Sequence, residues 1–262
     1  SGGSMEKTVD DYWLTGGLNV TPIKGLTLKG LFSWNMQSSV DDRTTLQFYV
    51  DEPNGEVLRS ARSATIDKVW KNTAKSNYFT MDITANYQKT FGKHDLSVLI
   101  GMQTELKQNN HMTGTSSGLY TQEIPSFNTS WKDNLSLTET KNHWSTMGYF
   151  FRLSYNYESR YLLDFNARYD AASKYPSDTR WAFFPSVSAG WNVAHEAFWP
   201  LQDVSTFKLT GSFGRLGDQS GDNYLYLPTM TSTSMVDMVI GGTRPPAVSM
   251  PGIVASNITW AK

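Results

Sequence analysis

The chain of 262 residues contains no cysteine. A chain without thiols can form neither a disulfide scaffold nor a zinc site built on thiolates. It also has no cysteine nucleophile for covalent catalysis. These three classes of site are therefore excluded.

An excess of charge of one sign is also missing, because 23 Lys and Arg nearly balance 24 Asp and Glu, for a formal net charge of −1. Nucleic acids and anionic membrane surfaces attract proteins mainly through an excess of positive charge. The balance removes that electrostatic reason to expect either partner, and we expect no nucleic-acid partner.

Long apolar runs are the third absence. The mean hydropathy is −0.42, and no stretch approaches the roughly 18–20 apolar residues of a membrane-spanning helix. Nevertheless 13 Phe, 9 Trp and 13 Tyr make up 13% of the chain. Helical membrane proteins are excluded, whereas membrane β-barrels are not, because their alternating strands average out as polar.

The dominant pattern is a period-two alternation of apolar and polar residues. Over 79–88 the sequence FTMDITANYQ places every apolar residue at an odd position and every polar residue at an even one. The segments 149–157 and 161–169 follow the same pattern with few exceptions. Successive side chains of a β-strand point to opposite faces, so these segments are predicted to be strands with one apolar and one polar face. Helical periodicity is nearly absent.

Eight strands are predicted in this way. They lie at 12–21, 26–37, 77–90, 95–108, 142–157, 161–174, 181–194 and 206–216, and a ninth is expected to begin near Ile258. Their length of about 10–15 residues exceeds the mode of ~5–6 for soluble proteins and is near the ~9–11 that cross a bilayer at a tilt. Short turns alternate with long polar stretches at 38–76, 110–140 and 217–257, and 195–205 is expected to be a longer turn.

Two architectures share this alternation. A soluble β-sandwich buries its apolar faces in a core, whereas an outer-membrane barrel turns them toward lipid and its polar faces toward the lumen. The aromatic positions favour the barrel, because Tyr and Trp prefer the bilayer interface and form girdles there. Tyr155, Tyr157 and Tyr161 gather at a short turn; Trp34, Tyr169, Tyr175 and Trp181 lie toward the long loops. In such barrels short turns are periplasmic and long loops extracellular.

Several motifs resemble one known family. The run from Gly148 to Trp191 reads GYFFRLSYNYESRYLLDFNARYDAASKYPSDTRWAFFPSVSAGW. It resembles the barrel hallmark of the SusC/RagA family of TonB-dependent outer-membrane transporters of Bacteroidetes, which typically shows GYFGRLNYDYKGKYLL and RWGxFPSVSAGW. The segments 23–29, 87–96, 209–219 and 257–260 resemble the family's IKGLxLK, YxKTFGxHxL, LRxSYGxTGNQ and NPxLxWE motifs. Asp218 and Ala261 depart from the family's Asn and Glu.

The resemblance implies an all-β fold, a transmembrane antiparallel β-barrel segment of about eight strands plus the start of a ninth. The whole barrel would have about 22 strands and an N-terminal plug. Residues 1–262 would all belong to this one outer-membrane barrel domain, and the plug, the TonB box and the signal peptide would precede residue 1. An isolated segment leaves two open sheet edges, so we expect it to be stable only within the whole barrel.

The resemblance also implies a function, the TonB-dependent import of a large nutrient across the outer membrane. An oligosaccharide is the first expectation and a peptide the second. The expected partners are a SusD-like surface lipoprotein, the TonB–ExbB–ExbD complex acting through the N-terminal part, and outer-membrane lipid. A passive porin and a soluble β-rich carbohydrate-binding module remain as alternatives.

No enzyme, cofactor or metal site is expected. The four histidines lack a ligand spacing such as H-E-x-x-H, and no G-x-S-x-G nucleophile motif occurs. Substrate contacts are expected from the long loops, where binding residues concentrate. The candidates are Asn109, Asn110, His111, Trp131, Asp178, Arg180 and Asn223, although loop packing or a partner contact is the more frequent role of such residues. The residues expected to face the lumen and hold the plug are Asp82, Arg152, Asp164, Arg168 and Asp170.

Overall fold

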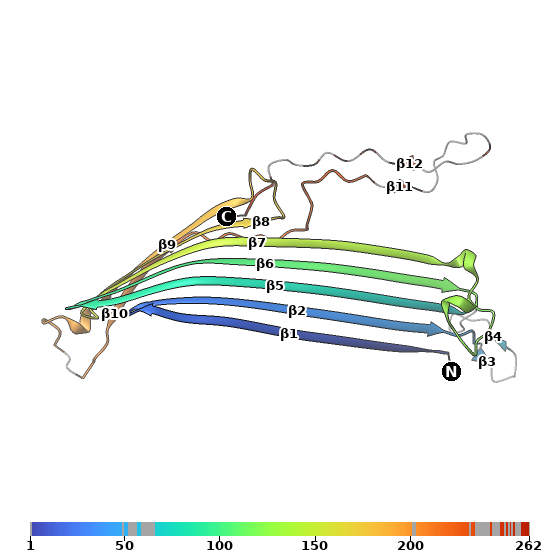
Figure 1. Cartoon of the computed structure of the whole chain (residues 1–262), viewed down its shortest axis with the longest axis horizontal. Coiled ribbons are helices and arrows are strands. Elements are labelled where there is room, and N and C mark those ends of the chain that lie inside the picture. The colour runs from blue at the N-terminus through green and yellow to red at the C-terminus, as the bar shows by residue number, and fades with distance from the viewer. Residues whose placement is uncertain are drawn as a thin grey trace. The chain divides into compact units, whose positions relative to one another are not determined.

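The computed structural model describes residues 2–48, 50–51, 57–58, 66–200, 203–230, 232–233, 242, 247–248, 250, 252, 254 and 258–261. Its main element is one sheet of eight strands (Figure 1). These are β1 (Gly3–Ile23), β2 (Leu26–Thr45), β5 (Lys68–Phe91), β6 (His94–Ser117), β7 (Ser136–Tyr157), β8 (Tyr161–Ala172), β9 (Trp181–Asn192) and β10 (Lys208–Gly214). The number of strands predicted from the alternation is confirmed.

The sheet order is β1-β2-β5-β6-β7-β8-β9-β10, so each long strand pairs with its neighbour in the chain. Two short pairs lie outside it, β3 (Val50–Asp51) with β4 (Val57–Leu58) and β11 (Ser232–Thr233) with β12 (Ala247–Val248). The described residues contain no α-helix, only the 3-10 turns η1 (Phe127–Thr129), η2 (Lys132–Asn134) and η3 (Val193–His195). The all-β prediction is therefore confirmed.

Several strands extend well beyond their predicted ends. The predicted loop 38–76 contains the last residues of β2 and the first of β5, and the predicted loop 110–140 contains the ends of β6 and β7. Toward these ends polar residues predominate on both faces of the strands, so the alternation of hydropathy fades. The ladder of backbone hydrogen bonds does not depend on the side chains and continues. The sequence pattern therefore detects the apolar part of each strand rather than its full length.

The predicted ninth strand is reduced to a single bridge. Residues 258–260 have no regular structure, and only Ala261 pairs, with Asp218. Ala261 accepts a backbone hydrogen bond from Asp218 at 2.9 Å and returns one at 3.2 Å. Most of the predicted loop 217–257 beyond residue 230 lies outside the described residues.

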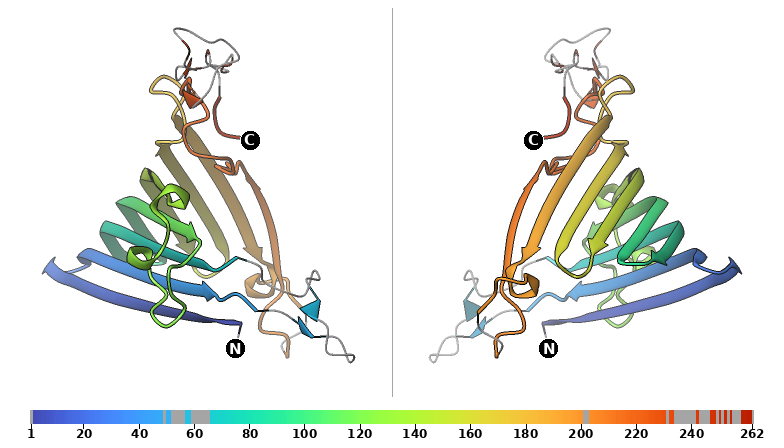
Figure 2. Two further views of the ribbon diagram at one scale, coloured as in Figure 1. Left: turned by 90° about the vertical axis from the view of Figure 1, so that its right-hand side faces the viewer. Right: turned by 90° about the vertical axis from the view of Figure 1, so that its left-hand side faces the viewer.

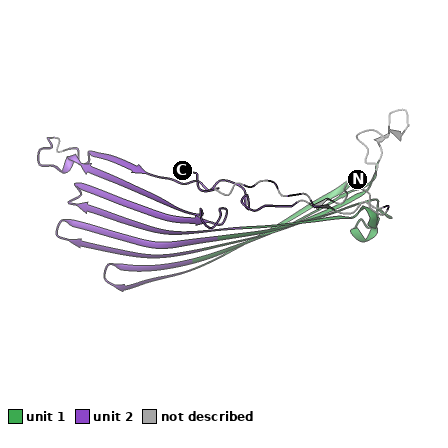
Figure 3. Cartoon of the chain, turned by 90° about the horizontal axis from the view of Figure 1, so that it is seen from above, with its two compact units in different colours: residues 1–16, 32–80, 106–143 green, residues 17–31, 81–105, 144–262 purple. Residues whose placement is uncertain are grey.

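The chain divides into two compact units, and strands β1, β2, β5, β6 and β7 each contribute residues to both (Figure 3). Unit 1 comprises residues 1–16, 32–80 and 106–143, and unit 2 comprises residues 17–31, 81–105 and 144–262. Within unit 2, β7, β8, β9 and β10 are paired antiparallel in one continuous register (Figure 2).

A tight turn joins β7 to β8. The Arg160 N–H donates to the Tyr157 carbonyl at 2.8 Å, and the two residues between them, Glu158 and Ser159, have φ of 51° and 56°. Positive φ at both central residues is the type I′ geometry, whose twist matches that of the flanking strands. Non-glycine residues seldom adopt it, so hairpin closure here depends on the contacts of the turn residues themselves.

Aromatic side chains form two rows across the apolar face of unit 2. Register pairs Tyr157 with Tyr161 and Trp191 in one row, and Tyr149 with Tyr169 and Phe183 in the other. Trp181 stacks on Tyr169 with ring centroids 4.7 Å apart. From Tyr161 to Tyr169 the strand rises about 26 Å, or about 20 Å along the membrane normal at a tilt of ~40°. An outer-membrane barrel needs an apolar band of roughly 25 Å between its girdles, and the rows approach that spacing.

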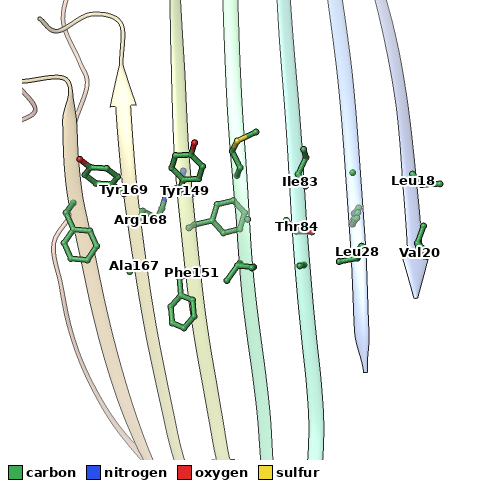
Figure 4. A pocket seen from close by; sticks show the side chains of 18 residues that line it. Leu18, Val20, Leu28, Ile83, Thr84, Tyr149, Phe151, Ala167, Arg168 and Tyr169 are labelled. Carbon is green, nitrogen blue, oxygen red and sulfur yellow. The ribbon is translucent and has the colours of Figure 1, made fainter. Parts of the chain in front are cut away.

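The apolar face has no covering layer among the described residues. Ile83 is 49% exposed and Phe183 52% exposed. These side chains belong to a shallow apolar depression of about 930 Å³, to which Tyr149 and Phe151 also contribute (Figure 4). A soluble sandwich would bury this face under a second sheet. An apolar face left open fits contact with lipid.

Candidate functional site: the polar face of unit 2

The polar face of β7 and β8 carries the charged residues expected to face the lumen. Alternation places Arg152 on the same face of β7 as Phe150, and it places Asp164, Arg168 and Asp170 together on β8. Register aligns Phe150 with Arg168 and Arg152 with Asn166, so these side chains form one continuous polar surface. Four of the five predicted lumen residues are thereby brought together.

Arg168 is the most constrained charge on this surface. Its Nε donates to Asp170 Oδ2 at 3.1 Å and its Nη2 to Asp170 Oδ1 at 2.9 Å. Its guanidinium carbon also lies 5.4 Å from the centroid of the Phe150 ring. The bidentate contact and the aromatic surface use the planar geometry that distinguishes Arg from Lys.

Gly148 makes this ion pair possible. It lies opposite Asp170 in the register, and a Cβ at this position would overlap the Asp170 carboxylate and come within 2.9 Å of Arg168 Nη2. The glycine that opens the motif GYFFRLSY is thus required because the Asp170 carboxylate approaches its Cα closely, and not because of its backbone conformation.

The other lumen candidates pair with neutral partners. Arg152 Nε donates to Asn166 Oδ1 at 2.6 Å, and the Ser154 hydroxyl donates to Asp164. Asp82 follows from alternation alone, because consecutive residues of β5 face opposite ways and its neighbours Met81 and Ile83 are exposed apolar side chains.

A polar cavity of about 260 Å³ opens on this face beside the ion pair. Its lining residues are Gln103, Glu105, Thr146, Met147, Gly148, Arg168, Asp170, Gly217, Asp218, Gln219 and Trp260. Three carboxylates and one guanidinium give it an acidic balance. The Gln219 Oε1 atom is buried and has no hydrogen-bond partner within the described chain. Glu105 and Gln219 were not among the residues predicted from the sequence.

Residues 258–261 form one wall of this region. Trp260 is buried against Tyr175 and Phe184, and its indole N–H donates to the Arg180 carbonyl at 2.8 Å. Tyr175 was expected among the loop-end aromatics, but it lies in this cluster, and burial raises the pKa of its phenol. Hydrogen bonds from Ser220 lower the pKa of Asp218, so that carboxylate stays charged.

Several known proteins resemble this chain in sequence or in fold. TonB-dependent receptor SusC of Bacteroides thetaiotaomicron is 31% identical over 194 residues, which cover 69% of this chain and 18% of the relative. TonB-dependent receptor P3 of Formosa agariphila is 30% identical over 197 residues, 72% of this chain and 18% of the relative. The structure of the RagAB peptide transporter superposes with a TM-score of 0.85 at 18% identity, covering 99% of this chain and 27% of that chain.

The chain belongs to the SusC/RagA family of TonB-dependent receptors. No family model matches it. It spans about a fifth of the curated relatives it matches, so it is a segment of such a receptor. The likeness to RagAB establishes the fold of the segment, an antiparallel sheet of eight strands that matches part of that chain. The matched relatives are receptors and transporters rather than enzymes.

Two features are absent from the described part of this SusC/RagA segment. It contains no helix long and apolar enough to cross a membrane. It also contains no group of three or more His, Asp or Glu side chains placed to hold a metal ion.

The predicted substrate residues of the SusC/RagA segment do not form a single site. Asn109, Asn110 and His111 were expected in a loop, but they lie within β6, which continues to Ser117. The strand continues because its backbone pairs with the neighbouring strands, although the alternation of hydropathy has faded there. Asn109 donates from Nδ2 to Asn142 Oδ1 at 2.8 Å, across to β7.

Trp131 does lie in a loop, before η2, and 54% of it is exposed. Its ring stacks on Tyr120 at 6.2 Å. The remaining three candidates belong to unit 2, whereas the first four belong to unit 1. Asp178 is exposed, and both Arg180 Nε and Asn223 Oδ1 are buried without a hydrogen-bond partner among the described residues.

The ion pairs at the short-turn end of the sheet were not predicted from the sequence. Glu158, in the β7–β8 turn, pairs with Lys93 of the β5–β6 turn and lies 3.6 Å from Arg160. The hydrogen bond from Lys93 lowers the pKa of Glu158. The sequence does place opposite charges in turns on the same side of the sheet, which indicates that ion pairs could form there. It does not indicate which turn pairs with which.

The same end holds a second carboxylate. Glu196 Oε1 accepts hydrogen bonds from the Tyr161 hydroxyl at 2.7 Å and the Trp191 indole at 2.9 Å. These donors lower its pKa. Arg160 Nη1 lies 3.7 Å from Glu196 and so links both carboxylates. The turns of unit 2 are therefore tied to the connection that leaves β9.

Proposed function

We propose that the receptor containing this segment imports a large nutrient actively across the outer membrane of a Gram-negative bacterium, with energy supplied through TonB. The observation that carries the proposal is the two-faced sheet, an exposed apolar face between aromatic rows backed by a charged polar face. Such a sheet suits a wall between lipid and a wide polar lumen. Its relatives are named TonB-dependent receptors, which supports coupling to TonB.

The polar face contributes contacts to the plug in this proposal. Arg168 and Asp170 neutralise each other, so neither carries an unpaired charge into a lumen that a plug would fill. The acidic cavity beside them would accept polar or cationic groups of the plug. Contacts of this kind can break and re-form as the plug moves, since a hydrated site can replace each of them with water.

The substrate we propose is an oligosaccharide, with a peptide as the second candidate. The sequence relatives include SusC, and the structural relative RagAB is described as a peptide transporter. A SusD-like surface lipoprotein would cover the long-loop side, and the TonB–ExbB–ExbD complex would act through the N-terminal part.

Uptake by cells tests the proposal. Cells carrying the full-length receptor are compared with deletion cells for import of labelled oligosaccharides and labelled peptides, with and without a protonophore. The proposal predicts import that requires both the receptor and the proton-motive force. Import that persists after the protonophore would identify a passive porin and refute the proposal. Extraction of the native protein without detergent would refute its membrane location.

A further inference from the structure

A second polar groove lies in unit 1 on β5, β6 and β7, toward the strand ends that the long loops join. Its volume is about 330 Å³. Its lining residues are Lys75, Asn77, Gln108, Asn109, Asn110, Lys141, Asn142 and His143. Five Asn or Gln residues and three basic residues line it, and no apolar residue does. Neither the proposed transport nor the candidate plug contacts use it.

Alternation places the groove on the lipid side of the sheet. Lys75, Asn77 and Phe79 share one face of β5, and Phe79 belongs to the apolar face of that strand. Phe79 stacks on Trp34 with ring centroids 6.3 Å apart and planes 8° apart. The Trp34 indole N–H donates to Asn77 Oδ1 at 3.4 Å. The groove therefore begins where the aromatic end of the apolar face stops.

The exposure of the lining supports this assignment. Gln108, Asn110 and Lys141 are exposed, whereas Asn109 and Asn142 are half-buried and hydrogen-bonded to each other on the opposite face. The exposed amides and lysines therefore open outward.

The height of Lys75 matches the headgroup layer of a bilayer. Four residues separate it from Phe79, about 13 Å along the strand and about 10 Å along the membrane normal at a tilt of ~40°. Aromatic girdles mark the edge of the hydrocarbon, and the headgroups lie just beyond it. A lysine at this height meets headgroups rather than acyl chains.

The charge of the groove favours an anion. Lys75 has no ion-pair partner among the described residues, and Lys141 pairs with Glu139 at 3.0 Å on an exposed surface. The charge of Lys75 is therefore not balanced by a carboxylate, and this count leaves His143 aside. Lysine binds phosphate as a point charge, and amide side chains supply donors and acceptors for sugar hydroxyls. The net charge of −1 for the whole chain hides this local excess.

We propose that this groove binds the phosphorylated saccharide headgroup of a glycolipid in the outer leaflet around the barrel. The proposal rests on the membrane placement in the proposed function. A lipid is favoured over a soluble anion because the groove adjoins the lipid-facing aromatics. Acyl chains lying along the apolar face would hold the headgroup at the groove, and a free anion has no such tether.

The test uses the full-length receptor in phosphatidylcholine vesicles that contain phosphorylated lipid A, with lipid retained after purification measured by native mass spectrometry. The variants are Lys75→Gln, Lys141→Gln and the double variant. Lys89→Gln is the matched control, because Lys89 occupies an exposed, odd-numbered position near the short-turn end of the same strand. We expect retention to fall about fivefold for each lysine and about 25-fold for both, with Lys89→Gln unchanged.

Three results would overturn the proposal. One is equal retention of dephosphorylated lipid A. Another is an equal loss in Lys89→Gln. The third is displacement of the lipid by inorganic phosphate or glucosamine phosphate at matching concentrations, which would identify a site for soluble anions. Uptake measured on the same variants separates the proposals. Lost lipid with intact import supports the lipid site, whereas intact lipid in the lysine variants refutes it whatever their import. Absence of import by the wild-type receptor, with its lipid retention still dependent on the lysines, refutes the proposed transport alone.

Discussion

Gly101 offers a sharp test of the packing on the polar face. A Cβ at Gly101 would overlap the ring of Phe150 on the neighbouring strand and lie 2.9 Å from the Ile83 carbonyl oxygen. The ring could turn, but the backbone carbonyl cannot withdraw without disturbing the sheet. Gly30 is the matched control, a glycine within β2 at which an added Cβ meets nothing within 4 Å.

The expected magnitudes follow from two effects. Overpacking costs about 1–3 kcal/mol, and replacing a strand glycine by alanine returns about 0.5–1 kcal/mol of backbone entropy. Gly101→Ala should therefore lower the free energy of unfolding by up to about 2.5 kcal/mol. Gly30→Ala should raise it by about 0.5–1 kcal/mol.

Urea unfolding of the full-length receptor in lipid vesicles, followed by tryptophan fluorescence and by heat-modifiable electrophoretic mobility, measures both changes. Phe150→Leu in the Gly101→Ala background should recover part of the loss, because residues in contact couple energetically. Equal effects of Gly101→Ala and Gly30→Ala would refute the assigned packing of Phe150 across Gly101.

Two further predictions concern charge. The pKa of Glu158 lies below its ordinary value because Lys93 hydrogen-bonds its carboxylate, so the pair stabilises the fold fully above about pH 4.5 and progressively less as pH falls through the lowered pKa. Unfolding midpoints measured across this range should fall more steeply for the wild type than for Glu158→Gln, and parallel curves would contradict the contact. Arg168→Glu should impair import, because it removes the ion pair with Asp170. Adding Asp170→Arg should restore import in part. Unchanged import in the single variant would contradict a role of this ion pair in contacting the plug.

The apolar part of the fold could be predicted from the sequence alone. Alternation identified eight strands, because a strand between lipid and lumen must present one apolar and one polar face along its whole buried length. The strand ends could not be predicted. At Asn109 and Asn110 both faces are polar, and continuation of β6 depends on pairing with β7, which no local pattern reveals.

Part of the candidate site could likewise be predicted from the sequence, and part could not. Arg152, Asp164 and Arg168 were predictable, since alternation alone fixes their face. The cavity beside Arg168 was not, because Glu105 and Gln219 reach it from distant parts of the chain. Trp260 was expected to begin a strand, but it packs in a cluster formed by a loop and β9. Such contacts depend on tertiary packing, which overrides local pattern.

The proposed placement of the sheet requires that odd positions of β5 face lipid and even positions face the lumen. Single cysteines at Ile83 and Asp82 test it in the full-length receptor freed of any other cysteine, reconstituted in vesicles and spin-labelled. The label at position 83 should be relaxed by oxygen, which partitions into lipid, and the label at position 82 by a water-soluble nickel chelate. Labels at Leu163 and Asp164 should repeat this contrast on β8. Equal accessibility at both members of each pair, or a reversed order, would contradict the account.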